Sequence, residues 1–127
     1  MQRAIQTSNA PAPIGPYSQA IVAGNFLFIS GQIALHPETN QLELENLEQE
    51  THRVMKNLKG ILEAAGAGFE NVVKSSIFLS DMNDFSRVNE IYASYFTTEI
   101  PPARETVQVS VLPKNVNVEI SMIAMIA

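Results

Sequence analysis

Cysteine is absent from this 127-residue sequence, and so are long hydrophobic runs. Without cysteine, disulfide bonds, thiol catalysis and thiolate metal sites are all excluded. No apolar stretch approaches the ~20 residues that a membrane-spanning helix needs, and the first eight residues lack the continuous apolar core of a signal peptide. We therefore expect a soluble protein located in the cytoplasm.

Basic residues are also in short supply, with eight lysines and arginines against thirteen acidic residues and a net charge of −5. Because a nucleic-acid backbone is held mainly by lysine and arginine, we do not expect strong nucleic-acid binding. The histidines are His36 and His52, and neither has a second ligand at the spacing of a metal site. The sequence therefore gives no reason to expect a metal or another cofactor.

The apolar residues predict two helices and several strands within a single domain covering residues 1–127. Steps of three and four residues predict a helix over 47–65, with Asn46 as its N-cap and Gly66 closing it. A second helix is expected over about 82–96. Strands are expected at 18–22, 26–33, 72–79, 104–111 and 116–126, the first two joined by a hairpin turn at 23–25.

The predicted order of elements is β-β-β-α-β-α-β-β, with two helices for about six strands. This order favours an α+β fold in which a six-stranded mixed sheet carries both helices on one face. The other face is then uncovered, although the apolar Ile123 and Met125 lie on it beside Glu119. An apolar face without an intramolecular cover predicts a homo-oligomer, with any site near a subunit boundary.

Two isolated charged residues are the strongest candidates for a functional site. Glu119 lies inside an otherwise apolar strand, where a carboxylate loses hydration unless something compensates it. Apolar surroundings raise a carboxyl pKa, which suits Glu119 to act as a general base or to orient water. Arg104 offers a planar guanidinium that fits a carboxylate, either that of Glu119 or that of a small acid. An ion pair between the two, or a solvated surface position for each, is the alternative to a site.

Four further residues are weaker candidates. Gly31 ends or bulges a strand of bulky residues, which lets a ligand approach the backbone, although a plain bulge is the more common case. Tyr17, fixed by a proline-rich segment, either buries a paired hydroxyl or lines a pocket. Asn89 is interpreted as a surface residue of the second helix, and Phe85 as a core residue.

A series of short motifs extends over almost the whole chain. It comprises APIGPYSQA at 12–20, ISGQI at 29–33, NVVK at 71–74, MNDF at 82–85, VNEIY at 88–92, PAR at 102–104, LPK at 112–114 and VEI at 118–120. Each motif is weak alone, but the ordered set at these spacings resembles the RidA/YjgF family, the reactive-intermediate deaminases once described as translation inhibitors.

The resemblance implies a homotrimer with a chorismate-mutase-like α+β fold and clefts between subunits. It also implies hydrolysis of 2-imino acids, such as 2-iminobutanoate and 2-iminopropanoate, to 2-keto acids and ammonia, with no cofactor. By the same resemblance, Arg104 grips the substrate carboxylate and Glu119 handles the attacking water. The residues that would help to form the pocket are Tyr17, Ser30, Gly31, Phe85 and Thr106.

Two positions depart from the family pattern, because many relatives have a small pair such as Ser-Cys where this chain has Glu105-Thr106. The pocket survives if Glu105 points away from Arg104, and Thr106 needs only its backbone N–H. The leading prediction is therefore an imine deaminase. The alternatives are a binding or regulatory protein for small 2-keto acids that uses the same arginine and, with less support, a ribonuclease or translation inhibitor or a chaperone-like protein.

Overall fold

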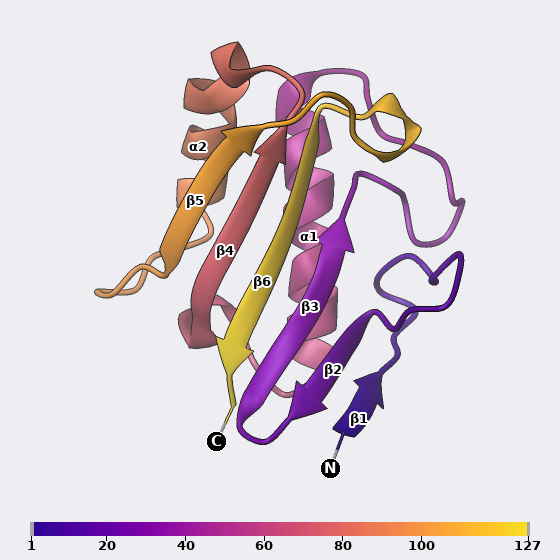
Figure 1. The fold of residues 1–127 in the computed structure, drawn as a ribbon, viewed down its shortest axis with the longest axis vertical. Helices are drawn as coiled ribbons and strands as arrows, with labels where there is room; N and C mark the ends of the chain where they lie inside the picture. The colour runs from indigo at the N-terminus through magenta and orange to yellow at the C-terminus, as the bar shows by residue number, and fades with distance from the viewer. Residues whose placement is uncertain (1, 127) are drawn as a thin grey trace.

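The computed structural model describes residues 2–126 as one open sheet with two helices packed on one side (Figure 1). The strands are β1 (Gln2–Ile5), β2 (Ala20–Ala23), β3 (Phe26–Gln32), β4 (Val72–Leu79), β5 (Ala103–Gln108) and β6 (Val118–Met125). The helices are α1 (Leu47–Ala64) and α2 (Phe85–Ala93), and short 3₁₀ turns occur at Phe69–Asn71, Met82–Asp84 and Pro113–Asn115.

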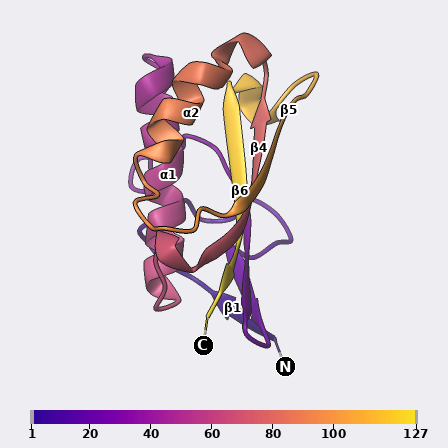
Figure 2. The ribbon, with the colours of Figure 1, turned by 90° about the vertical axis from the view of Figure 1, so that its left-hand side faces the viewer.

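The sheet has the order β1-β2-β3-β6-β4-β5. Strands β4 and β5 run parallel, and every other pair of neighbours is antiparallel. Figure 2 shows α1 and α2 together on one side of the sheet. The prediction of an α+β fold, with a six-stranded mixed sheet and both helices on one face, is therefore confirmed.

Helix α1 begins and ends close to where the sequence predicts. The side chain of Asn46 accepts a hydrogen bond from the N–H of Gln49 at 2.8 Å, which caps the first turn. Gly66 follows the helix with a φ of 75°, a left-handed conformation that glycine adopts without a steric penalty. The buried face of α1 packs against β3 and β6. The resulting core includes Val54, Leu58, Ile61, Ile120 and Met122.

Several boundaries differ from the sequence prediction: β5 ends at Gln108 instead of 111, and β6 begins at Val118 instead of 116. Strand β1 has no counterpart among the strands located from the sequence, because three of its four residues are exposed and no apolar alternation marks it. Pairing with β2 defines β1, from Gln2 opposite Ala23 to Ile5 opposite Ala20. Helix α2 is shorter than expected at both ends, because its predicted first turn is a separate 3₁₀ turn and its C-cap is Ser94.

No helix of residues 2–126 covers the face of the sheet opposite α1 and α2 (Figure 2). Along β6, buried residues alternate with partly exposed ones, and Glu119 belongs to the second set. Four large apolar side chains elsewhere on this face are 40–49% exposed: Phe26, Phe28, Val107 and Met125. The expected apolar and uncovered face is therefore present, and we call it the open face.

Candidate functional site

Arg104 lies on β5, the edge strand, and points to the helix side of the sheet. Its Nη1 donates a hydrogen bond to Oδ1 of Asn89 on α2 at 2.6 Å. Its Cζ lies 5.6 Å from the ring centroid of Phe85 and 5.1 Å from that of Tyr92. Contacts between a guanidinium and an aromatic ring contribute about 0.5–1 kcal/mol at exposed positions. Helix α2 therefore fixes the direction of the guanidinium through neutral groups and leaves its positive charge available.

The two residues after Arg104 point to opposite faces. Glu105 lies on the open face, where Ser76 donates a hydrogen bond to it and the Nζ of Lys74 lies 3.0 Å from its Oε1. The Ser76 hydrogen bond, followed by the interaction with Lys74, lowers the pKa of Glu105 below its ordinary value. The hydroxyl oxygen of Thr106 is buried and has no hydrogen-bond partner. Glu105 therefore does not compete for Arg104, as the resemblance requires.

Glu119 lines a cavity of about 290 Å³ on the open face. The cavity is mostly apolar, and its lining includes Pro11, Ala12, Ile14, Tyr17, Gly31, Ile33, Leu35 and Lys114. Burial raises the pKa of Glu119 above its ordinary value of 4.5. A carboxyl group with a raised pKa is a better proton acceptor when ionised, as the sequence reasoning anticipates.

Gly31 brings the backbone of β3 directly against Glu119. The pairing of β3 with β6 is irregular between Ile29 and Gln32, which confirms the expected bulge. A Cβ atom at position 31 would lie 2.5 Å from Oε2 of Glu119, a distance that real Cβ atoms do not tolerate. Tyr17 is 53% exposed and lines the same cavity. Of the two interpretations left open by the sequence, the buried ring is therefore wrong.

Ser30 lies next to this cavity but outside its lining. Its hydroxyl donates a hydrogen bond to the carbonyl oxygen of Ser18 at 2.6 Å. Its backbone N–H donates to the carbonyl oxygen of Gln19 at 3.0 Å. In the single chain, Ser30 therefore connects β3 to the segment before β2, and its contact with a substrate stays a prediction.

Arg104 and Glu119 lie on opposite faces of the sheet. Residues paired on neighbouring strands place their side chains on the same face. Arg104 pairs with Ser75, which is fully buried beneath the helices. Glu119 pairs with Phe78, and Phe78 pairs with Val107 on the open face. The ion pair between Arg104 and Glu119 that the sequence left open is therefore wrong within one chain.

The predicted site residues consequently form two groups. The first group, around Arg104, contains Phe85 and Thr106; the second, around Glu119, contains Tyr17 and Gly31, with Ser30 beside it. Phe85 is half-buried and contacts the guanidinium, so it has a site position as well as a packing role.

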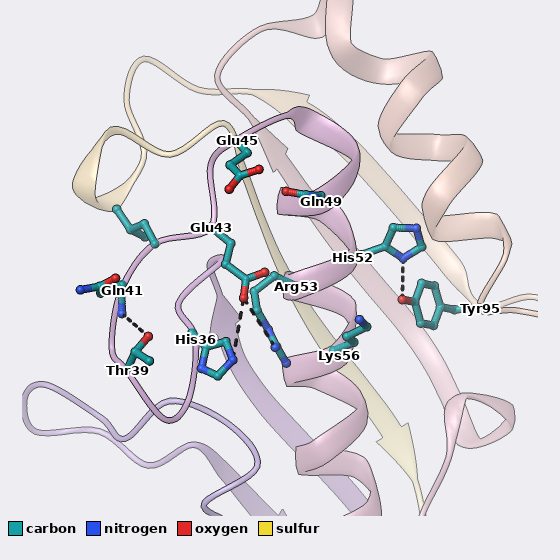
Figure 3. Close-up of a pocket in the computed structure, with 11 residues that line it drawn as sticks. His36, Thr39, Gln41, Glu43, Glu45, Gln49, His52, Arg53, Lys56 and Tyr95 are labelled. Carbon is teal, nitrogen blue, oxygen red and sulfur yellow. Dashed lines mark hydrogen bonds and ion pairs between the residues drawn. The ribbon is translucent and has the colours of Figure 1, made fainter.

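A further groove, drawn in Figure 3, is lined by neither Arg104 nor Glu119. It measures about 790 Å³, and its lining includes His36, His52 and Arg53. His36 Nε2 and Arg53 Nη1 lie 3.9 and 4.0 Å from the same oxygen of Glu43, and His52 Nδ1 lies 2.7 Å from the hydroxyl of Tyr95. His36, Arg53 and Glu43 therefore interact with one another, as do His52 and Tyr95.

Residues 2–126 contain no cluster of three or more His, Asp or Glu side chains that could hold a metal ion. Within the same part of the chain, neither helix is long and apolar enough to cross a membrane.

Comparison with known proteins identifies the family. A family model described as endoribonuclease L-PSP matches residues 7–126. The chain belongs to this family, known as RidA/YjgF. Among RidA/YjgF relatives, a RutC family protein from Pyrococcus horikoshii is 53% identical over 124 residues, which cover 98% of each protein.

Two further relatives support the same assignment. The 2-iminobutanoate/2-iminopropanoate deaminase of Mus musculus is 48% identical over 124 residues, which cover 98% of this chain and 91% of the mouse protein. A crystal structure of a Rid family protein from Yersinia pestis is 46% identical and has a TM-score of 0.97, covering 99% of this chain and 100% of that one. The family predicted from the motifs is therefore confirmed.

Two residues that organise these groups were not predicted from the sequence as site residues. Asn89 was expected at the surface but accepts the hydrogen bond from Arg104. Its position three residues before Tyr92, on the same helix face, is a signal that both could contact one side chain. Gln19 is buried beside the cavity of Glu119, and a polar residue directly before the apolar run of β2 is the matching signal.

Proposed function

We propose that this protein hydrolyses 2-imino acids to 2-keto acids and ammonia. Arg104 would hold the substrate carboxylate with its planar guanidinium. Glu119 would accept a proton from the attacking water. The proposal is supported by an arginine whose charge no carboxylate of residues 2–126 neutralises through an ion pair, and by a desolvated carboxyl group. The mouse relative named as an imine deaminase supports the substrate class.

The reaction needs positioning and proton transfer. Water attacks the electrophilic carbon of the protonated C=N bond, forming the new C–O bond while the C=N π electrons move to nitrogen. Glu119 takes one proton of this water and returns it to the nitrogen. As the C–N bond breaks and the C=O bond forms, Glu119 accepts the remaining hydroxyl proton and releases it to the departing ammonia, so the products are the 2-keto acid and ammonium. Because imines hydrolyse unaided in water, lowering the barrier by ~3–6 kcal/mol would accelerate the reaction by ~10²–10⁴.

The single observation that shapes the proposal is the separation of Arg104 and Glu119 on opposite faces of one sheet. A small 2-imino acid cannot reach both groups of one chain through the sheet. We therefore assign Arg104 and Glu119 of each site to two neighbouring copies, in a homo-oligomer in which the β5 edge of one copy lies beside the open face of the next. The resemblance favours a homotrimer, which closed cyclic symmetry permits.

Mixing two inactive variants tests both the reaction and the division of the site. Arg104→Ala and Glu119→Gln would each lose activity alone, because every site would lack one group. After the two variants are dissociated and reassembled together, mixed trimers would contain one intact site, so roughly a quarter of wild-type activity would return. The imine would be generated by an amino-acid oxidase, and the remainder trapped with semicarbazide.

Each outcome of the mixing experiment has a separate meaning. An inactive wild type would refute the deaminase. An active wild type with an inactive mixture would place both groups of a site on one chain and refute the division. Mixing Arg104→Ala with the double variant Arg104→Ala/Glu119→Gln is the matched control, because none of its sites contains an arginine.

A binding protein for 2-keto acids is the second candidate, since Arg104 alone provides its anchor. It predicts that wild type binds a small 2-keto acid, loses this binding with Arg104→Ala, and never consumes the imine. Equilibrium binding measured by calorimetry therefore separates the two functions when it is combined with the assay.

A further inference from the structure

The buried side chain of Gln19 makes four hydrogen bonds to the backbone of the segment that precedes it. It is only 3% exposed. Its Oε1 accepts from the N–H of Thr7 at 2.8 Å, and its Nε2 donates to the carbonyl oxygens of Thr7, Ala10 and Pro11 at 3.0, 3.2 and 2.9 Å. An amide nitrogen has two protons, so these three carbonyls use its whole donor capacity.

The segment held by Gln19 forms one wall of the cavity of Glu119. We call residues 7–17 the strap, and its residues in the cavity lining are Pro11, Ala12, Ile14 and Tyr17. Three prolines make the strap stiff, but residues 12–17 are exposed and contribute little to the core. The position of this wall therefore depends on its attachment points. These are the buried Ala10, the amide of Gln19 and, directly after the strap, the hydrogen bond from Ser30 to Ser18.

We propose that Gln19 is a positioning residue that holds the strap over Glu119, keeping excess water out of the cavity and Tyr17 beside the carboxyl group. The inference rests on the proposed function, because it matters for catalysis only if Glu119 is the base. Gln19 itself lines the cavity, but its amide bonds to the backbone of the strap, so it would act by holding the strap and not by contacting the substrate.

The electrostatics of the cavity make the proposal measurable. Burial alone accounts for the raised pKa of Glu119. The other ionisable groups in the lining are Tyr17 from the strap and Lys114 from the turn before β6, while β3 contributes none. Displacement of the strap would admit water, so the pKa of Glu119 would fall toward 4.5. The loss of a distant packing contact would not produce this change.

Gln19→Met is the informative variant, because methionine keeps the length of the side chain and removes all four hydrogen bonds. We expect faster amide exchange at Thr7, a lower pKa of Glu119 by carbon-detected NMR, and a fall in kcat/KM of roughly 10- to 100-fold. Thr51→Val is the matched control. Thr51 is equally buried, and its hydroxyl donates to the carbonyl of Leu47 within α1, away from the strap.

The experiment distinguishes failure of this inference from failure of the proposed function. If wild type shows no activity, the deaminase is refuted, whereas the exchange at Thr7 and the pKa of Glu119 still decide the role of Gln19. If Gln19→Met lowers only the melting temperature, as Thr51→Val does, the positioning role is wrong. Should Gln19→Met not fold, Ser30→Ala releases another attachment and must lower the pKa of Glu119; an unchanged pKa would overturn the inference.

Discussion

The surroundings of Arg104 and of Glu119 prepare two charged groups in opposite ways. Arg104 stands on an exposed edge strand, and an amide and two aromatic rings set its direction without neutralising it. Glu119 lies in a mostly apolar cavity, where lost hydration raises its pKa. An anchor for a carboxylate needs direction and charge, whereas a proton acceptor gains from poor solvation. In the proposed deaminase, the two groups would therefore be specialised parts of one site, each incomplete without the other.

The largest expected effect comes from removing the anchor. Arg104→Ala should lower kcat/KM by on the order of 10³-fold or more, since the substrate carboxylate loses its bidentate partner. Steady-state kinetics measure this, and size-exclusion chromatography checks that the assembly stays intact. Arg87→Ala is the matched control, because Arg87 is an exposed arginine of α2 paired with Glu48. Loss of assembly in Arg104→Ala would make the residue structural.

Removing the base should affect turnover more than binding. Glu119→Gln should reduce kcat by roughly 10²-fold while the affinity for a 2-keto acid is retained, because the anchor is unchanged. Glu105→Gln is the control on the same face, since Glu105 is already occupied by Ser76 and Lys74. Undiminished turnover in Glu119→Gln would remove this residue from the mechanism.

A smaller effect should follow from filling the space between β3 and β6. Gly31→Ala places a Cβ atom 2.5 Å from Oε2 of Glu119, so the carboxyl group must move. We expect a loss of about tenfold in kcat from this misplacement. In Glu119→Gln/Gly31→Ala, the two losses should be less than additive, because both act on one group. Fully additive losses would separate Gly31 from Glu119.

The smallest effect concerns stability against pH. Because the pKa of Glu119 is raised in the folded chain, wild type loses stability as pH rises from below 4.5 through the raised value. Glu119→Gln lacks this loss of stability. Its melting temperature should be slightly higher than that of wild type at pH 8 and equal to it at pH 4. Glu105→Gln should melt below wild type at pH 8, since the lowered pKa of Glu105 stabilises the chain there. Melting curves showing the same sign for both variants would contradict this difference between the two carboxylates.

Local patterns predicted much of this fold. The three- and four-residue steps and the Asn46 cap located α1, and Gly24 with Asn25 forms the turn of the expected hairpin. Alternation also predicted correctly that Arg104 and Thr106 share a face and that Glu105 takes the other. These features depend on residues close in sequence, so their physical causes are visible in it.

The relation between strands could not be predicted in the same way. The alternation of apolar and polar residues shows which residues of one strand share a face. Only the pairing between strands shows which residues of β5 lie on the same face of the sheet as a given residue of β6. Arg104 and Glu119 therefore looked like potential partners, whereas β4 between them places them apart. The hydrogen bonds from Gln19 to the strap could not be predicted for a similar reason, since the partners of Gln19 lie eight to twelve residues away in an irregular segment.

The central place of β6 has a consequence for how this chain folds. β6 is the last strand in sequence, yet it joins β3 to β4, and without it the two halves of the sheet share no strand pairing. Contacts between segments this distant in sequence form only after a long loop has closed. The conformational entropy lost in closing that loop slows folding. Insertion of β6 would therefore be the late, cooperative step. Because β6 carries Glu119, a folding intermediate that lacks this strand would contain the surroundings of Arg104 but not the cavity of Glu119.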